Sequence, residues 1–191
     1  DLAPTGAAEG FGPDRLRFTD VSREVGLKND TVDPPRSNVG AFVGGAALGD
    51  VDGDGMVDLF VTQIGSSNRF YLGSADGSLE ARTEPAGLGD HVQGPSNGSA
   101  ASVWADVDGD GDLDLFVGGV GEQADRLYLN DGSGSFTEES ELRGLGLQPD
   151  GSASASGGFA TMGAAFADID RDGDLDLVTT HWAPPGFSES G

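Results

Sequence analysis

Short apolar segments recur along the chain in pairs, and an aspartate-rich loop separates the two members of each pair. The segments before the loops are GAALG, SVWA and GAAFA, and those after them are LFVTQ, LFVGG and LVTTHW. They are rich in Val, Phe and Thr and bounded by Gly and Asp, which is the pattern of short buried strands. The pattern therefore predicts three β-hairpins, each with an aspartate-rich loop at its tip.

Two of the three hairpins are followed by a second pair of predicted strands. Residues 68–80 (NRFYLGSADGSLE) and 125–140 (DRLYLNDGSGSFTEES) each hold two strand-like segments around turn residues that tolerate positive φ. Each unit is therefore expected to be a four-stranded antiparallel sheet in an all-β chain. The third unit lacks this second pair, because LVTTHW is followed by APPGFSESG.

A segment near the N-terminus has no predicted sheet of its own. Residues 14–27 (DRLRFTDVSREVGL) resemble the closing part of the second unit, DRLYLNDGSGSFTEESELRGLGL. We therefore expect them to supply closing strands, either to the third unit of the same chain or to a neighbouring chain by strand exchange. Exchange of this head-to-tail kind propagates into filaments where the rotation does not close.

The three loops share one nine-residue pattern: DVDGDGMVD from Asp50, DVDGDGDLD from Asp106 and DIDRDGDLD from Asp168, at intervals of roughly 60 residues. Carboxylates packed this densely repel one another unless a cation lies among them. Aspartates at positions 1, 3, 5 and 9, with a backbone carbonyl at position 7, would wrap a chain around calcium. The predicted ligands of about three calcium ions are Asp50, Asp52, Asp54, Met56 and Asp58, then Asp106, Asp108, Asp110, Asp112 and Asp114, then Asp168, Asp170, Asp172, Asp174 and Asp176.

A calcium loop within a β-hairpin fits this pattern better than an EF-hand, a magnesium site or a metal-free acidic turn. Glycine at position 6 (Gly55, Gly111 and Gly173) allows the turn that brings position 7 inward. An EF-hand would need glutamate at position 12, where valine or threonine stands within a strand-like run. Magnesium prefers fewer protein ligands. Exposed acidic turns without a metal would not require three copies with one spacing.

Composition narrows the partners and the compartment. The formal net charge is −23, from 33 acidic and 10 basic residues, which disfavours nucleic acid and anionic membranes as partners. There are no cysteines, and we identify no membrane-spanning run and no signal segment at Asp1. Weak calcium loops fill where free calcium is near millimolar, so an extracellular or cell-surface location is expected. Asn29 and Asn97 fit the glycosylation pattern, which also arises often by chance.

The repeated segments resemble the FG-GAP/VCBS repeats of integrin-α-like β-propellers. The resemblance is carried by RFTDVSREVGL (residues 17–27), WADVDGDGDLDLFVGG (104–119) and FADIDRDGDLDLVTT (166–180). It implies tandem four-stranded propeller blades, a structural calcium in each loop, and extracellular adhesive or scaffolding roles. Three repeats are too few for the usual closed ring, so the expected architecture is incomplete or completed by strand exchange.

The expected organisation follows from these repeats. Residues 1–13 form an N-terminal tail, and residues 14–191 hold three repeats at approximately 36–94, 95–151 and 152–191, with 14–27 as closing strands.

Catalysis is not expected. His91 and His181 each stand alone, and GPSNG (residues 94–98) matches a nucleophile elbow only formally, because no helical run follows it. The clustered carboxylates are assigned to calcium, and Trp104 and Trp182 are expected to pack within or between units.

The leading hypothesis is an extracellular calcium-binding repeat protein that acts as a self-assembling or adhesive scaffold. The alternative is a ligand- or glycan-binding propeller fragment of a larger secreted protein or enzyme. The expected partner is the chain itself, as a homo-oligomer or filament, or another extracellular protein or glycan.

Overall fold

The computed structural model describes residues 19–27, 44–89, 97–121, 123–145 and 160–182, which contain β-strands and turns but no helix. The strands form two four-stranded sheets and one two-stranded sheet, each antiparallel and in chain order. The first sheet consists of β1 (Ala46–Gly49), β2 (Asp58–Val61), β3 (Arg69–Gly73) and β4 (Leu79–Ala81). The second consists of β5 (Gly98–Ala105), β6 (Asp114–Val120), β7 (Arg126–Asn130) and β8 (Phe136–Glu138), and the third of β9 (Ala160–Ala167) and β10 (Asp176–Trp182).

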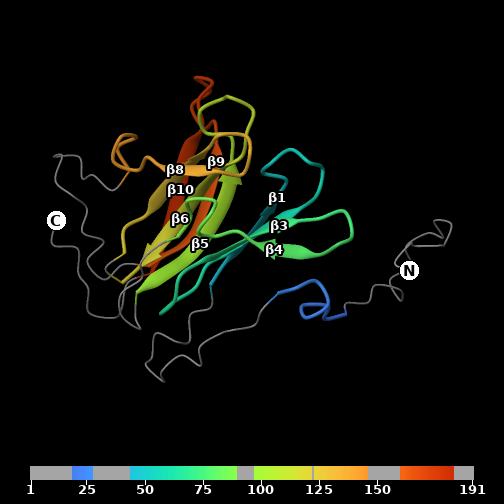
Figure 1. The fold of residues 1–191 in the computed structure, drawn as a ribbon. Helices are drawn as coiled ribbons and strands as arrows, with labels where there is room; N and C mark the ends of the chain where they lie inside the picture. The colour runs from blue at the N-terminus through green and yellow to red at the C-terminus, as the bar shows by residue number, and fades with distance from the viewer. Residues whose placement is uncertain (1–18, 28–43, 90–96, 122, 146–159, 183–191) are drawn as a thin grey trace, which may run out of the picture.

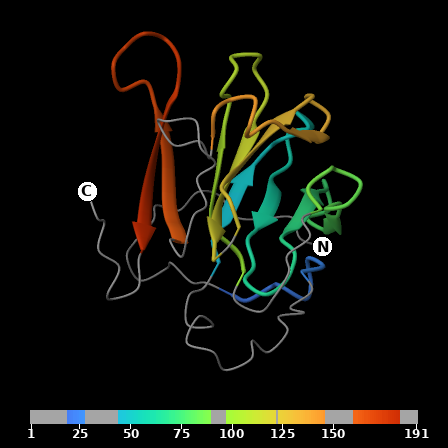
Figure 2. The same ribbon diagram turned by 90° about the vertical axis from the view of Figure 1, so that its left-hand side faces the viewer.

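The three sheets lie side by side in chain order (Figures 1 and 2). The first strand of the middle sheet, β5, packs against the first strands of both neighbours, β1 and β9. The prediction of four-stranded antiparallel units is confirmed for the first two sheets, and each aspartate loop joins the first two strands of its sheet as expected. In the third unit, the described residues form only the first hairpin.

Successive sheets are joined by one repeated aromatic contact. At each of the two junctions, the residue two positions before a loop faces the preceding sheet and contacts the residue two positions after that sheet's loop. Trp104 packs edge-on against Phe60 with ring centroids 6.2 Å apart, and Phe166 packs the same way on Phe116 at 6.3 Å. The register that places a loop at the tip of each hairpin therefore also places an aromatic residue at each junction.

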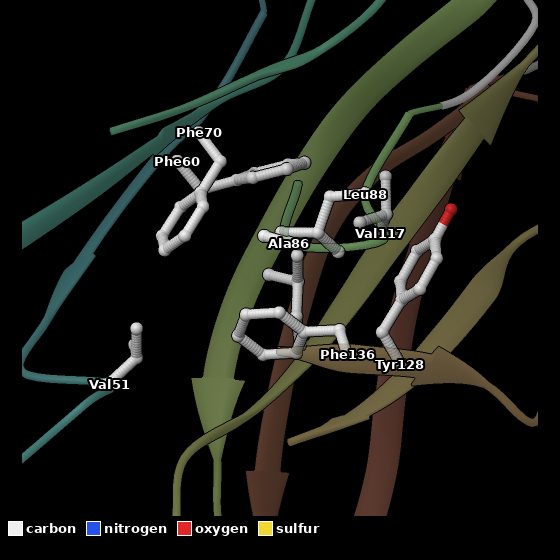
Figure 3. Packing of buried hydrophobic residues seen from close by; sticks show 9 residues of the cluster. Val51, Phe60, Phe70, Ala86, Leu88, Val117, Tyr128 and Phe136 are labelled. Carbon is white, nitrogen blue, oxygen red and sulfur yellow. The ribbon is translucent and has the colours of Figure 1, made fainter. Parts of the chain in front are cut away.

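The main hydrophobic core fills the space between the first and second sheets (Figure 3). Phe60 and Phe70 come from the first sheet, and Tyr128 and Phe136 from the second. Trp104 packs against this cluster and contacts the Phe136 ring at 5.7 Å. A smaller core between the second and third sheets consists of Ala100, Val120 and Ala160, with Ile64 and Met162 against it.

A turn follows the fourth strand of the first two sheets, and a matching turn precedes the first sheet. We call residues 21–27, 82–88 and 139–145 the closing turns, because each contains the same backbone hydrogen bond from its fifth residue to its first. The first two dock on the fourth strand of the next sheet: Leu79 N donates to Val25 O, and Phe136 N donates to Ala86 O, both at 2.8 Å. Each of these two turns therefore connects to the sheet that follows it.

This arrangement places part of the N-terminal segment that was expected to supply closing strands. Residues 21–27 form a closing turn against β4, whereas residues 14–18 lie outside the described residues. The assignment of residues 14–27 as the closing strands of a unit stays a prediction.

Removal of a core aromatic ring tests the packing between the first two sheets. Phe70 is fully buried and contacts the rings of Trp104 and Phe136 at 6.2 and 5.8 Å. We expect Phe70→Ala to lower the free energy of unfolding by about 3–5 kcal/mol in urea titrations. The control Leu142→Ala, at a side chain that is 82% exposed, should change it by less than about 0.5 kcal/mol. A cost below about 1 kcal/mol for Phe70→Ala would contradict this core.

Candidate metal centres

Each aspartate loop lies at the tip of the first hairpin of its sheet, and the loops of the second and third units extend from the same end of the sheets (Figure 2). Counted from 1 to 9, the loops span residues 50–58, 106–114 and 168–176. Position 9 is the first residue of the second strand in every unit. One end of each loop is therefore fixed in a sheet ladder, while the other positions lie on the turn.

In each loop the carboxylates of positions 1, 3 and 9 converge. One oxygen from each of the three side chains lies within 4.8 Å of the other two. Oxygen ligands on opposite sides of a calcium ion lie about 5 Å apart, since each lies about 2.3–2.6 Å from the ion. The spacing therefore fits a single hard cation held between them. The three groups are Asp50, Asp52 and Asp58; Asp106, Asp108 and Asp114; and Asp168, Asp170 and Asp176.

The remaining predicted ligands are placed differently. The position 5 carboxylates of Asp54, Asp110 and Asp172 are not in these groups; each accepts the backbone N–H of its own position 7 residue at 2.7–3.0 Å. A carboxylate has further acceptor sites, so this bond leaves metal binding at position 5 a prediction. The carbonyl ligands predicted at Met56, Asp112 and Asp174 also remain predictions.

The loop backbone is shaped by the same aspartates. The position 1 carboxylates of Asp50 and Asp106 accept the N–H of the position 6 glycines at 2.9 and 3.1 Å. Those glycines, Gly55 and Gly111, have φ values of 87° and 101°, a region that favours glycine. Local hydrogen bonds thus fold the loop and direct its carboxylates towards one point.

Position 9 connects the loop to the sheet. Asp58 accepts the N–H of Val51 in its own loop and of Gly73 on β3, both at 2.8 Å. Asp114 repeats the arrangement with Val107 and with Asn130 on β7, both at 2.9 Å. In the first two units, the third strand of the sheet therefore helps to orient the position 9 carboxylate of the candidate metal centre.

Asn130 also connects the first loop to the second sheet. Its amide Nδ2 donates to the carbonyl of Val51 in the first loop at 2.7 Å and to that of Leu113 at 3.1 Å. Its Oδ1 accepts the N–H groups of Gly132 and Gly134 in the turn that follows. Sequence patterns did not identify Asn130, because it lies 79 residues from Val51 in the chain and no motif marks the pair.

The position 9 carboxylates of the first two units are buried, which is uncommon for a charged group. Asp58 and Asp114 are 0% and 1% exposed. Desolvation raises the pKa of both carboxyls, the two backbone N–H donors oppose that shift, and the negative charges at positions 3 and 5 add to it. A buried carboxylate surrounded by like charges is a site that a cation would stabilise.

The third loop departs from the other two. Arg171 occupies position 4 with φ of 65°, where Gly53 and Gly109 have φ of 72° and 76°. A residue with a side chain is strained in this left-handed region. Asp176 accepts the N–H of Ile169 but is not buried.

The sequence matches the model of the FG-GAP-like repeat twice, at residues 50–117 and 106–179. These matches cover more than half of the chain and contain all three loops. The chain belongs to the FG-GAP-like repeat family. The resemblance predicted from the loop motif is therefore confirmed. No curated protein gives a significant match to the chain.

As an FG-GAP-like repeat protein, the chain contains propeller-blade-like units built from open antiparallel sheets, with acidic clusters that could hold metal ions. Repeats of this family are typically structural or binding units found in extracellular proteins. Within the described residues, no helix has the length and apolar character needed to cross a membrane.

The histidines, tryptophans and glycosylation-pattern asparagines have varied placements. Asn29 and His91 lie outside the described residues. Trp104 lies at the junction of the first two sheets, as expected. Trp182 is 41% exposed at the end of β10. His181 is also exposed there, and Asn97 lies just before β5, where its carbonyl accepts the N–H of Gly65.

The raised pKa values of Asp58 and Asp114 predict how metal-free stability depends on pH. Because the folded state holds these protons more tightly than an unfolded chain, their contribution is fully present below the unfolded pKa of 3.8 and is lost as pH rises through the higher folded value. We therefore expect the melting temperature in metal-free buffer to be higher at pH 4.5 than at pH 7.5.

Calcium binds the deprotonated carboxylates, so excess calcium should reduce or reverse this difference in calorimetric scans. Asp58→Asn removes one titrating group and should weaken the pH dependence of the metal-free protein. A melting temperature that rises from pH 4.5 to 7.5 without metal would contradict the assignment.

Proposed function

We propose that this chain is an extracellular structural protein whose propeller-type repeats are stabilised by calcium, one ion in each aspartate loop. The observation that carries the proposal is the buried position 9 carboxylate, Asp58 or Asp114, directed towards two further carboxylates. A divalent cation would neutralise this repulsion and fix the loop to its sheet. The ion has no catalytic step to perform in this proposal.

The charge balance supports the calcium requirement. Arg143 reaches a loop carboxylate: it lies 3.8 Å from Asp108 and also pairs with Glu139 at 3.2 Å. Arg143 is itself partly exposed, and an ion pair of this kind contributes little in water. A bound cation is therefore the stronger source of compensation for the loops.

Calcium titration tests this function directly. With about 100-fold excess over its Kd, each bound ion should stabilise the folded chain by about 2.7 kcal/mol, seen as a higher melting temperature. Isothermal titration should give three sites, and Asp50→Asn, Asp106→Asn and Asp168→Asn should each weaken or remove one.

The matched controls are Asp76→Asn and Asp131→Asn, which remove the same charge from exposed turns. Asp76 and Asp131 each accept a hydrogen bond from a nearby serine and belong to no loop cluster. These variants should keep all three sites. An unchanged melting temperature in 10 mM calcium would refute the proposed function.

The outer faces of the first and third described sheets, which we call the end faces, support a scaffolding role. At the position where Trp104 and Phe166 face a preceding sheet, the first sheet has Leu48, which is 67% exposed. At the position of Phe60 and Phe116, the third has Val178, which is 48% exposed. The two end faces thus carry apolar counterparts of one repeated junction, which would allow copies to stack head to tail.

Light scattering tests this assembly. In millimolar calcium we expect particles several times heavier than the 19.4 kDa chain, and in metal-free buffer a lower mass. Val178→Lys should reduce the mass in calcium, because it places a charge on the end face. Ala75→Lys, at an exposed residue of the β3–β4 turn outside the acidic clusters, is the control. A monomer in both conditions would remove self-assembly from the proposed role.

A further inference from the structure

The third sheet ends at β10 in the part of the chain that the structure describes. In the other two units, the equivalent strands β2 and β6 pair with a third strand, which then pairs with a fourth. The first two units therefore show what can occupy this edge. Comparison of equivalent atoms in the three units identifies three polar groups to which a bound hairpin would donate a hydrogen bond.

The first group is the position 9 carboxylate. Asp58 and Asp114 each use Oδ1 to accept an N–H from the third strand, that of Gly73 or Asn130. Asp176 accepts the N–H of its own loop through Oδ2, as they do. Among the described residues, no third-strand N–H donates to it. A strand added along β10 would supply this donor.

The second group is the backbone of the second loop. Val51 in the first loop is 2% exposed, and its carbonyl accepts the amide of Asn130 from the third strand of the following sheet. Val107 is the equivalent residue of the second loop and is only partly buried. In the region that the structure covers, no asparagine of the third sheet reaches its carbonyl. An asparagine at the end of an added strand would repeat the bond.

The third group is the closing turn at residues 139–145. The carbonyls of Val25 and Ala86 accept an N–H from the fourth strand of the next sheet. The next residue in each of those turns passes close to that strand: a Cβ on Gly26 would lie 2.9 Å from Leu79 O, and one on Gly87 would overlap Phe136 O.

Arg143 and Gly144 are the equivalent residues of the 139–145 turn. A Cβ built on Gly144 would meet nothing within 4 Å, although its φ of 75° is close to those of its counterparts. Within the described chain, no fourth-strand N–H donates to Arg143 O. The turn thus has the conformation of the docked turns without the strand that docks on them.

We propose that the edge of β10 and the 139–145 turn form a binding site for a β-hairpin of the β7–β8 type, which the described residues do not supply to this edge. One hairpin satisfies all three groups, because its first strand pairs with β10 and its second strand crosses Gly144. This inference rests on the proposed structural function and names the partner of its open end.

The site selects a hairpin of defined chemistry. The first strand must end in asparagine, which would donate its N–H to Asp176 and its amide to Val107 O. A hairpin like β3–β4 has Gly73 at this place and lacks that amide. The second strand must carry a free N–H opposite Arg143 O, as Phe136 does for Ala86. Backbone pairing provides affinity and the asparagine provides selectivity.

Calcium and the hairpin should bind cooperatively. The added strand would orient the Asp176 carboxylate, which belongs to the third acidic cluster, and a cation there would favour the same orientation. Coupling of this kind is reciprocal and typically amounts to about 5–150-fold in affinity. We therefore expect hairpin binding to be at least about fivefold tighter in calcium.

The experiment uses a fluorescent peptide of residues 125–139 (DRLYLNDGSGSFTEE) and the 191-residue chain, with anisotropy measured in excess calcium at about 0.15 M salt to screen like charges. Saturable binding is expected, and the peptide with Asn130→Ala should bind at least tenfold more weakly. Hydrogen exchange should show new protection of β10 and residues 139–145. Protection elsewhere, or equal binding of both peptides, would overturn the proposal.

Two glycine variants provide a matched pair in the protein. Gly144→Ala places a Cβ where the second strand would cross and should weaken binding at least tenfold. Gly77→Ala is the control, because Gly77 also has positive φ, 82°, and open space around it, but lies in the β3–β4 turn. Equal losses in both variants would show that strain, and not the site, controls binding.

The outcomes separate this proposal from the function on which it rests. If calcium raises the melting temperature but the peptide does not bind, the hairpin site is wrong and the calcium-stabilised module stands. If calcium has no effect on the melting temperature, the proposed function fails, whatever the peptide does. If the peptide binds equally well with and without calcium, the coupling through Asp176 is refuted.

Discussion

The structure depends on a buried carboxylate at position 9 of the aspartate loop in each four-stranded sheet. Asp58 and Asp114 begin the second strand of their sheets, and each is held by one N–H from the loop and one from the third strand. Burial of an anion is unfavourable unless hydrogen bonds or a cation compensate it. The backbone donors give part of that compensation, and the neighbouring carboxylates create the need for the rest. Loop, sheet and acidic cluster are therefore one coupled unit.

The same register organises the contact between units. A hairpin that places its loop at the tip also directs one residue before the loop and one after it towards opposite neighbours. Trp104 on Phe60 and Phe166 on Phe116 are two copies of this junction, and the closing turns add a backbone bond between sheets. Asn130 extends the coupling to the first loop. The first and second units are consequently each stabilised by the unit that follows, as expected of a repeat protein in which neighbouring units share interfaces.

This dependence explains why the third unit differs. Its hairpin packs on the second sheet through Phe166 and Ala160, so the side that faces a predecessor is complete. The side that faces a successor has Val178 exposed, and Asp176 is not buried. Arg171 adopts a left-handed conformation there that glycine adopts in the first two loops. Among the described residues, the third loop therefore has fewer of the contacts that shape the first two, although its three carboxylates converge in the same way.

The sequence by itself determined the repeat, the hairpins and the position of the loops, because strand periodicity and loop spacing are local properties of the chain. It also indicated the metal chemistry, since the alternating aspartates recur at one spacing in all three units. Tertiary structure alone decided that positions 1, 3 and 9 converge, that position 9 is buried in the first two units, and that Asn130 reaches Val51 from 79 residues away. It also decided that the 21–27 turn docks on β4. Those features depend on which sheet lies beside which, and contacts between residues far apart in the chain leave no local pattern from which they could be predicted.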